Sequence, residues 1–140
     1  MSMYTMNDAE LDIPEAWTDQ SVNVFSASSA PPVPMSLVIT RDRLGPGQEL
    51  AEFAEVKLGE LESQLDSFKV IEKRQVEVAG QVALEAEIRW SSKQGPVHQR
   101  QVYIDHGQKV LVLTATAAGT ISEAYAEQFD QILATLKLRP

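Results

Sequence analysis

The chain has 140 residues, with 12 lysines and arginines against 20 aspartates and glutamates, which gives a formal net charge of −8. This length indicates a single domain over residues 1–140, and the acidic balance excludes the basic surface that nucleic acids and anionic lipids require. Cysteine is absent, which excludes disulfides, thiol nucleophiles and thiolate metal sites. The N-terminus does not resemble a signal peptide and no stretch approaches about 20 apolar residues, so we expect a cytoplasmic protein without a membrane span.

Two short strands are predicted in the first third of the chain. Residues 11–17 form an extended segment turned by a proline, and its Trp17 is expected to anchor in the core or at its edge. Residues 20–25 and 35–41 alternate as strands, and we expect them to pair across the proline-rich surface loop 26–34. The branched side chains that share a face within these strands are Val22 and Val24 in the first, and Leu37 and Ile39 in the second.

An amphipathic helix is predicted after the Gly-Pro-Gly turn that ends at Gly47. Apolar residues recur at spacings of three and four from Leu50 to Leu65, and this periodicity explains Leu58 as a core residue. A second helix is predicted after Thr120, with Ser122 as its N-cap. The buried stripe expected on this second helix comprises Tyr125, Phe129, Ile132, Leu133 and Leu136.

Four further strands are predicted between the two helices. The segments are residues 68–78, 82–90, 97–104 and 110–116, joined by short turns. The last of them is apolar or uncharged at every position, which indicates a central strand covered on both faces. The fold class is therefore α+β, with an antiparallel sheet of about six strands packed with two main helices.

Residues capable of catalysis are few. His98 and His106 cannot form a metal site without carboxylates from elsewhere in the fold, and we expect both to be surface or edge histidines. Glu85 and Glu87 could act as an acid and base pair, but an exposed charged strand face is the favoured interpretation. No phosphate-binding loop, nucleophile elbow or metalloprotease motif is present, so we expect no enzyme, no metal and no cofactor.

A different pattern is more informative, because the four aliphatic side chains are aligned on two strands that we expect to be neighbours, and Gln99 and Gln101 share a face of a third strand. An apolar strip with a few uncharged amides suits a groove for an apolar helix. The alternative is that all four aliphatic side chains belong to the core. The residue pattern alone does not decide between these interpretations.

Specific strings add a resemblance that covers nearly the whole chain. The strings are Asp12-Ile13-Pro14-Glu15-Ala16-Trp17 with the strand that ends at Phe25, Leu37 to Asp42, Arg100 to Ile104, and the closing Leu136, Arg139 and Pro140. In this order and spacing they resemble the DcrB-like domain of the effector-associated (Eag) chaperones of bacterial type VI secretion. That family implies a Mog1/PsbP-like α/β sandwich that forms a homodimer. It also implies cytoplasmic binding of the N-terminal transmembrane segments of a cognate effector, which is then loaded onto the secretion spike.

The resemblance also implies which residues contact the client helix. The apolar cradle would consist of Val22, Val24, Leu37 and Ile39, and Gln101 would meet polar atoms of the client, with Leu58 as a weaker candidate. The alternatives are a small-ligand-binding domain, with an enclosed pocket in a monomer, and an enzyme with titratable groups in a cleft. The sequence does not fix which sheet face lines the groove, because a one-residue change of register exchanges the two faces.

Overall fold

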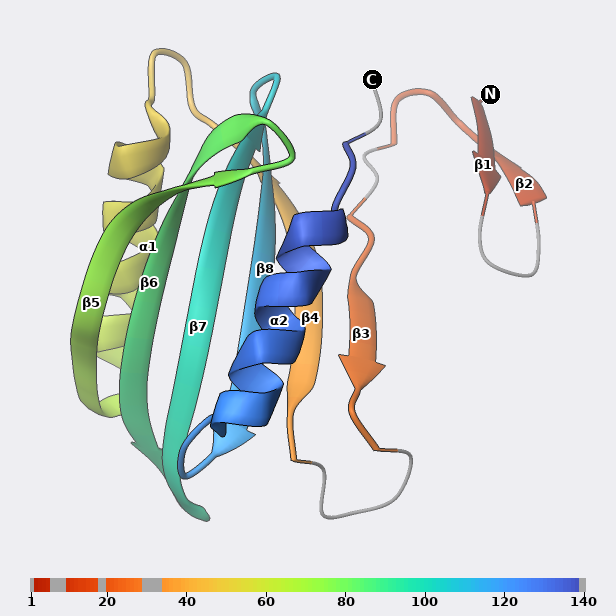
Figure 1. Ribbon diagram of the computed structural model, residues 1–140. Helices are drawn as coiled ribbons and strands as arrows, with labels where there is room; N and C mark the ends of the chain where they lie inside the picture. Colours follow the sequence, from red (N-terminus) through yellow and green to blue (C-terminus); the bar gives the residue numbers. More distant parts are fainter. Residues whose placement is uncertain (1, 6–9, 18–19, 29–33, 139–140) are drawn as a thin grey trace.

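The computed structural model describes residues 2–5, 10–17, 20–28 and 34–138. Its elements are β1 (Ser2–Thr5), β2 (Glu10–Ile13), β3 (Asn23–Ser26), β4 (Ser36–Arg43), α1 (Leu50–Gln64), β5 (Asp66–Val78), β6 (Gln81–Ser92), β7 (Gly95–His106), β8 (Lys109–Ala118) and α2 (Glu123–Thr135). Strands β3 to β8 form one six-stranded antiparallel sheet in the order β3-β4-β8-β7-β6-β5, while β1 and β2 pair as a separate hairpin (Figure 1). The predicted α+β class, with six strands and two helices, is confirmed.

The two helices lie on opposite faces of the sheet. In Figure 1, α1 lies behind the strands β5 and β6, whereas α2 crosses in front of β8 and β4. Each helix buries its apolar residues in a separate cluster, one on each face. We therefore call the two sides of the sheet the α1 face and the α2 face.

Tight turns set the register of the long strands. Val78 pairs with Gln81, so Ala79 and Gly80 alone connect β5 to β6, with φ angles of 54° and 76°. Gly107 and Gln108 connect β7 to β8 in the same way, with φ angles of 57° and 67°. Two consecutive positive φ angles define the turn whose twist matches that of antiparallel strands. These turns keep the alternating apolar residues of neighbouring strands in line.

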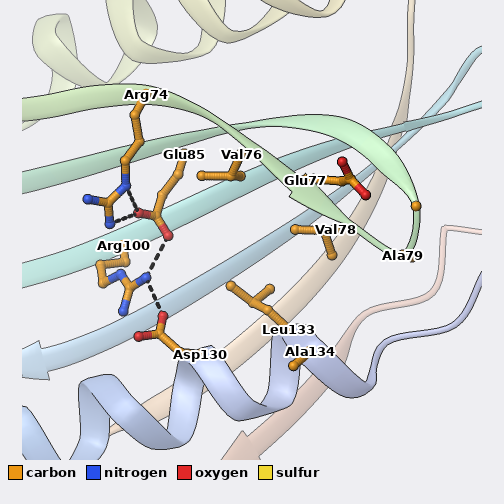
Figure 2. Close-up of a pocket in the computed structure, with 11 residues that line it drawn as sticks. Arg74, Val76, Glu77, Val78, Ala79, Glu85, Arg100, Asp130, Leu133 and Ala134 are labelled. Atoms are coloured by element: carbon orange, nitrogen blue, oxygen red, sulfur yellow. Dashed lines mark hydrogen bonds and ion pairs between the residues drawn. The ribbon is translucent and has the colours of Figure 1, made fainter.

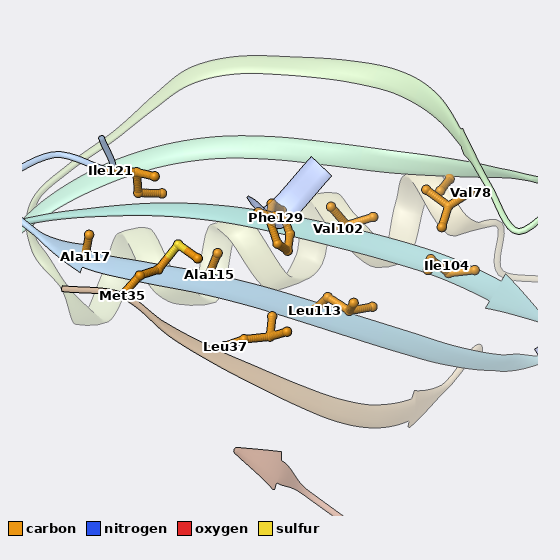
Figure 3. Close-up of a cluster of buried hydrophobic side chains, with 11 residues drawn as sticks. Met35, Leu37, Val78, Val102, Ile104, Leu113, Ala115, Ala117, Ile121 and Phe129 are labelled. Atoms are coloured by element: carbon orange, nitrogen blue, oxygen red, sulfur yellow. The ribbon is translucent and has the colours of Figure 1, made fainter. Parts of the chain in front are cut away.

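The larger core lies between α2 and the sheet (Figure 3). Phe129 of α2 is fully buried against strand residues such as Val102 and Leu113. Burying an aromatic or branched side chain of this size contributes about 1.5–3 kcal/mol. The buried members of this cluster are Met35, Leu37, Val78, Ala83, Val102, Ile104, Leu113, Ala115, Ala117, Ile121 and Phe129.

Strand β8 lies between β4 and β7, as expected for a central strand. Its Val110 is buried in the cluster beneath α1, and its Leu113 is buried in the cluster beneath α2. The prediction that this strand is covered on both faces is therefore confirmed at these two positions.

Several local expectations need correction. Trp17 was expected in or beside the core, but it is 68% exposed and lies in the segment between β2 and β3, outside the sheet. Val22 precedes β3 rather than lying in it, and Ile132 of α2 is exposed. Ser122 does cap α2, since its hydroxyl accepts a hydrogen bond from the Tyr125 amide at 3.3 Å. Residues 29–33 of the predicted loop and the closing residues 139–140 lie outside the described residues.

Candidate functional site

Helix α1 covers only part of its face of the sheet. It contacts β5, β6 and β7, and its buried residues Phe53, Ala54 and Leu58 pack on side chains of β6, β7 and β8. The α1-face side chains of β3 and β4 belong to neither core cluster. The part of this face beyond α1, over β3, β4 and the adjacent half of β8, is therefore left open.

The register of the sheet places four side chains in one row across this open area. Val24 of β3 is opposite Val38 of β4, Val38 is opposite Thr114 of β8, and Thr114 is opposite Gln101 of β7. Val24, at the outer end of the row, is 63% exposed. The row runs from an apolar outer edge to an uncharged polar group next to α1.

A groove with a cavity volume of about 240 Å³ lies where the row meets α1. Its floor includes Gln101, Tyr103, Val112 and Thr114, and its helical wall comprises Lys57, Glu60, Leu61 and Gln64. Lys57 reaches across from α1 to Asp42 of β4 with an N–O distance of 3.1 Å. This ion pair bridges the helical wall and β4 at one end of the groove.

Gln101 has hydrogen-bonding capacity left over. Its carboxamide oxygen accepts a hydrogen bond from the Tyr103 hydroxyl, whereas its Nε2 group has no partner among the described residues. The neighbouring Gln99 is fully engaged by comparison, because it accepts from Trp90 Nε1 at 3.2 Å and donates to the Thr116 hydroxyl at 3.0 Å. Gln101 can therefore donate to an acceptor that enters the groove.

The hydroxyl partner of Gln101 is fixed in position and stays protonated. The ring of Tyr103 packs edge-to-face on Phe53 of α1, with ring centroids 6.2 Å apart. Burial raises the pKa of the Tyr103 phenol, because a phenolate would lack solvation there. The Tyr103 hydroxyl thus remains a donor, and it holds the Gln101 oxygen so that the amide nitrogen is the group left over.

The structure separates the residues predicted to form the apolar cradle. Val24 and Gln101 lie on the α1 face in one row, and Val22 is exposed just before β3. Leu37 and Ile39 are opposite Phe25 and Asn23, so their side chains lie on the α2 face, where Leu37 is buried and Ile39 packs against the core. The predicted single strip is therefore split between two faces, because Val24 aligns with Val38 instead.

Leu58 lies on the buried face of α1 and packs in the core, as its helical periodicity predicted. The residue that sequence reasoning missed is the half-buried Val38, which takes the place expected for Leu37 and Ile39 in the row between Val24 and Gln101. Alternation along β4 identified its two faces, but only the register with β3 shows which face adjoins Val24.

The family model described as DcrB matches residues 8–135 of this sequence. The chain belongs to the DcrB family. It is 30% identical over 141 aligned residues to the protein named Effector EagT6 of Pseudomonas aeruginosa, with 100% of this chain and 98% of that protein covered. This relationship confirms the resemblance to Eag proteins that the sequence motifs indicated.

Solved structures agree with the family. A crystal structure of a Pseudomonas aeruginosa protein of unknown function, described as a putative regulator, matches with a TM-score of 0.85 at 30% identity, covering 100% of this chain and 98% of that chain. CyanoP, the cyanobacterial PsbP of Synechocystis, matches with a TM-score of 0.55 at 13% identity, covering 94% of this chain and 88% of that one. LpqN of Mycobacterium tuberculosis, involved in cell envelope biogenesis, matches with a TM-score of 0.54 at 17% identity, covering 88% of this chain and 87% of that chain. The likeness to CyanoP confirms the predicted PsbP-like fold.

On the α2 face, this DcrB family protein contains a network of ion pairs (Figure 2). Glu85 of β6 accepts from Arg74 Nε at 2.7 Å and from Arg100 Nη2 at 2.7 Å, and Arg100 also reaches Asp130 of α2 at 2.8 Å. Burial alone would lower the pKa of Arg100, but hydrogen bonds to Asp130 and Glu85 outweigh it and raise the pKa. The expectation that Glu85 lies on an exposed charged face was wrong, since two arginines make its burial possible.

The two histidines lie in different surroundings. His98 was expected at the surface but is buried, because its Nδ1 accepts from the Ile121 amide at 2.9 Å and its Nε2 lies 2.8 Å from Glu87. His106 is half-buried near the end of β7. In the part of the chain that the structure describes, no three His, Asp or Glu side chains are close enough to hold a metal ion. Within the same residues, no helix has the length and apolar composition needed to cross a bilayer.

Proposed function

We propose that this DcrB family protein is a cytoplasmic chaperone and adaptor of a type VI secretion effector, whose N-terminal transmembrane segments it binds and shields from water. The relationship to EagT6 supports an effector as the partner. The observation that carries the proposal is the open half of the α1 face. There the row from Val24 to Gln101 runs beside α1 and is covered by no other described element.

The chemistry of the row suits an apolar helix. A client helix of about 20 apolar residues loses exposed surface on Val24 and Val38, and each buried CH₂ group contributes about 0.8 kcal/mol. The free Nε2 group of Gln101 donates to a carbonyl or hydroxyl oxygen on the same helix. We assign the client contacts to Val22, Val24, Val38 and Gln101. Leu37, Ile39 and Leu58 support the sheet and helix from within the core.

Assembly completes the proposed role. A homodimer would double the groove available to the client, and the net charge of −8 would keep the loaded complex in solution. The chaperone would then help load the effector onto the secretion spike. In this role the protein is not an enzyme and needs neither ATP nor a cofactor.

A small apolar ligand is the second candidate, and one observation favours it. A hollow of about 230 Å³ lies between α1 and the strands β5 and β6. Its apolar lining includes Ala54, Leu58, Leu84 and Ala86, and the exposed ion pair of Lys73 with Glu55 lies at its rim. This volume falls below the roughly 300–1,000 Å³ of usual ligand pockets, which is why we rank it second.

The test is co-expression with a type VI secretion effector that has an apolar N-terminal segment, and with the same effector lacking that segment. Capture is compared for the wild-type chain, Val24→Asp and Val82→Asp. Val82 is a matched control, because it is a strand valine with 58% exposure against 63% for Val24 and lies away from the groove near the β5–β6 turn.

We expect capture to require the apolar segment, to fall at least tenfold for Val24→Asp, and to remain unchanged for Val82→Asp. Circular dichroism should show both variants folded. If the folded wild-type chain ignores the segment, the chaperone role is wrong. If Val24→Asp and Val82→Asp reduce capture of the effector equally, the assignment of the client contacts to the groove is wrong.

A further inference from the structure

A second hollow lies on the other face of the sheet, at the end of β4 and the start of β8. Its cavity volume is about 560 Å³. Its lining comprises Glu15, Ala16, Trp17, Gln20, Arg41, Asp42, Arg43, His106, Lys109, Val110, Leu111 and Leu138. We call this feature the basic hollow. Its lining includes Trp17 and Arg41, two residues of the sequence strings quoted above to which the proposed function assigns no role.

Three cationic side chains lie close together in the basic hollow, and repulsion between them lowers the stability of the β4–β8 pair. Arg43 of β4 is directly opposite Lys109 of β8, and Arg41 lies two residues along the same face of β4. Like charges directly opposite in a sheet destabilise the strand pair. A chain with a net charge of −8 has few cations, and here it places three of them on one end of two neighbouring strands.

No carboxylate neutralises the opposed pair. Among the described residues, the side chains of Arg43 and Lys109 have no hydrogen bond or ion pair, whereas Arg74 and Arg100 are both bound to Glu85. Asp42 lies between Arg41 and Arg43 in sequence, but its carboxylate binds Lys57 of α1 at 3.1 Å. Arg41 Nη1 is oriented by Asn23 Oδ1 at 2.7 Å and the Ser21 carbonyl at 3.1 Å. The positive charge of the basic hollow is thus directed to solvent.

The basic hollow also offers apolar surface. Trp17 is 68% exposed and is among the residues that line the hollow, together with Leu111 and Leu138. An exposed indole beside unpaired cations is typical of surfaces that bind a peptide with both acidic and apolar side chains. A phosphate group fits less well. Among the described residues, the lining holds no helix N-terminus and no glycine, and Glu15 adds negative charge.

We propose that the basic hollow binds an acidic segment of a partner protein. Carboxylates of that segment pair with Arg43 and Lys109, and an apolar side chain packs on Trp17. Arg41, Arg43 and Lys109 lie on the α2 face, so these cations can be paired while the α1-face groove holds a client helix. The proposal therefore stands independently of the chaperone role.

Fluorescence anisotropy with a labelled, capped ten-residue peptide tests the proposal. The peptide contains four glutamates and two leucines, and its control has glutamine in place of every glutamate. The full-length wild-type chain is compared with the double variant Arg43→Gln/Lys109→Gln. The matched double variant Lys69→Gln/Lys93→Gln removes the same charge from exposed lysines elsewhere.

We expect saturable binding of the acidic peptide alone, weakened about tenfold by Arg43→Gln/Lys109→Gln, weakened by Trp17→Ala, and changed less than about twofold by the matched variant. Binding should weaken as salt is raised. Equal weakening by both double variants would overturn the proposal, as would absence of binding up to about 1 mM peptide. Binding of inorganic phosphate without binding of the peptide would instead identify a small-anion site and also overturn it.

Discussion

A single carboxylate, that of Glu85, connects three strands with a helix. It binds Arg74 of β5 and Arg100 of β7, and Arg100 in turn binds Asp130 of α2 (Figure 2). The Arg100 guanidinium also stacks on Phe129, 4.8 Å from the ring centroid. Removing the Glu85 charge leaves Arg100 buried with only the exposed Asp130 to balance it.

We therefore expect Glu85→Gln to lower the free energy of unfolding by about 3 kcal/mol, as for other broken buried pairs. Urea denaturation followed by circular dichroism measures this change. Glu55→Gln is the control, since its ion pair with Lys73 is exposed and should cost less than about 1 kcal/mol. Equal denaturation midpoints for the two variants would contradict a structural role for the network.

The buried phenol of Tyr103 predicts that the free energy of unfolding depends on pH in the alkaline range. Burial raises the pKa of its phenol, so folding favours the neutral form. Its contribution to stability is complete below the ordinary tyrosine pKa of about 10, and it is lost as the pH rises from there toward the higher folded value. Tyr103→Phe cannot ionise, although it loses the hydroxyl bond to Gln101, worth about 1 kcal/mol.

The variant should accordingly be less stable than the wild type near pH 8, and the difference should shrink as the pH rises beyond about 10. Urea unfolding at a series of alkaline pH values measures it. A difference that stays constant over this range would show that the phenol does not titrate with unfolding.

At the scale of elements, the β5–β6 turn contains a residue ill suited to its conformation. Ala79 has a φ of 54°, a region that costs most residues with a Cβ about 1–2 kcal/mol and that asparagine tolerates better. Ala79→Asn would create the Asn-Gly pair preferred in such turns. We expect it to raise the free energy of unfolding by about 0.5–1 kcal/mol, measured by thermal denaturation. Asparagine at the exposed Ala118 of β8 should not stabilise the chain.

The same elements show how far the sequence alone could lead. Strands β6, β7 and β8 were predictable, because each alternates regularly and short turns join them. The row from Val24 to Gln101 was not, because the sequence between β3 and β4 does not fix the register of these two strands. Val24 could therefore face Val38 as readily as Leu37. The Glu85 network was missed for a related reason, since its members come together only after four elements have packed.

At the scale of the whole molecule, we expect the free chain to be a homodimer. The side chain of Phe25 is exposed at the β3 edge on the face opposite Val24, and a second copy packed there would remove it from water while leaving the client contacts open. Light scattering coupled to gel filtration should give twice the mass of one chain. The mass of a single chain at every concentration would contradict this expectation.

The opposite edge of the sheet, formed by β5, is bulged and charged. Strand β5 pairs only with β6, its register is interrupted twice between Asp66 and Glu72, and charged side chains follow one another along it. Bulged and charged edges resist the addition of further strands. Growth of a continuous sheet from copy to copy would need both edges, and this chain offers only the four residues of β3. We therefore expect the native chain to resist fibril growth by edge-to-edge addition of strands.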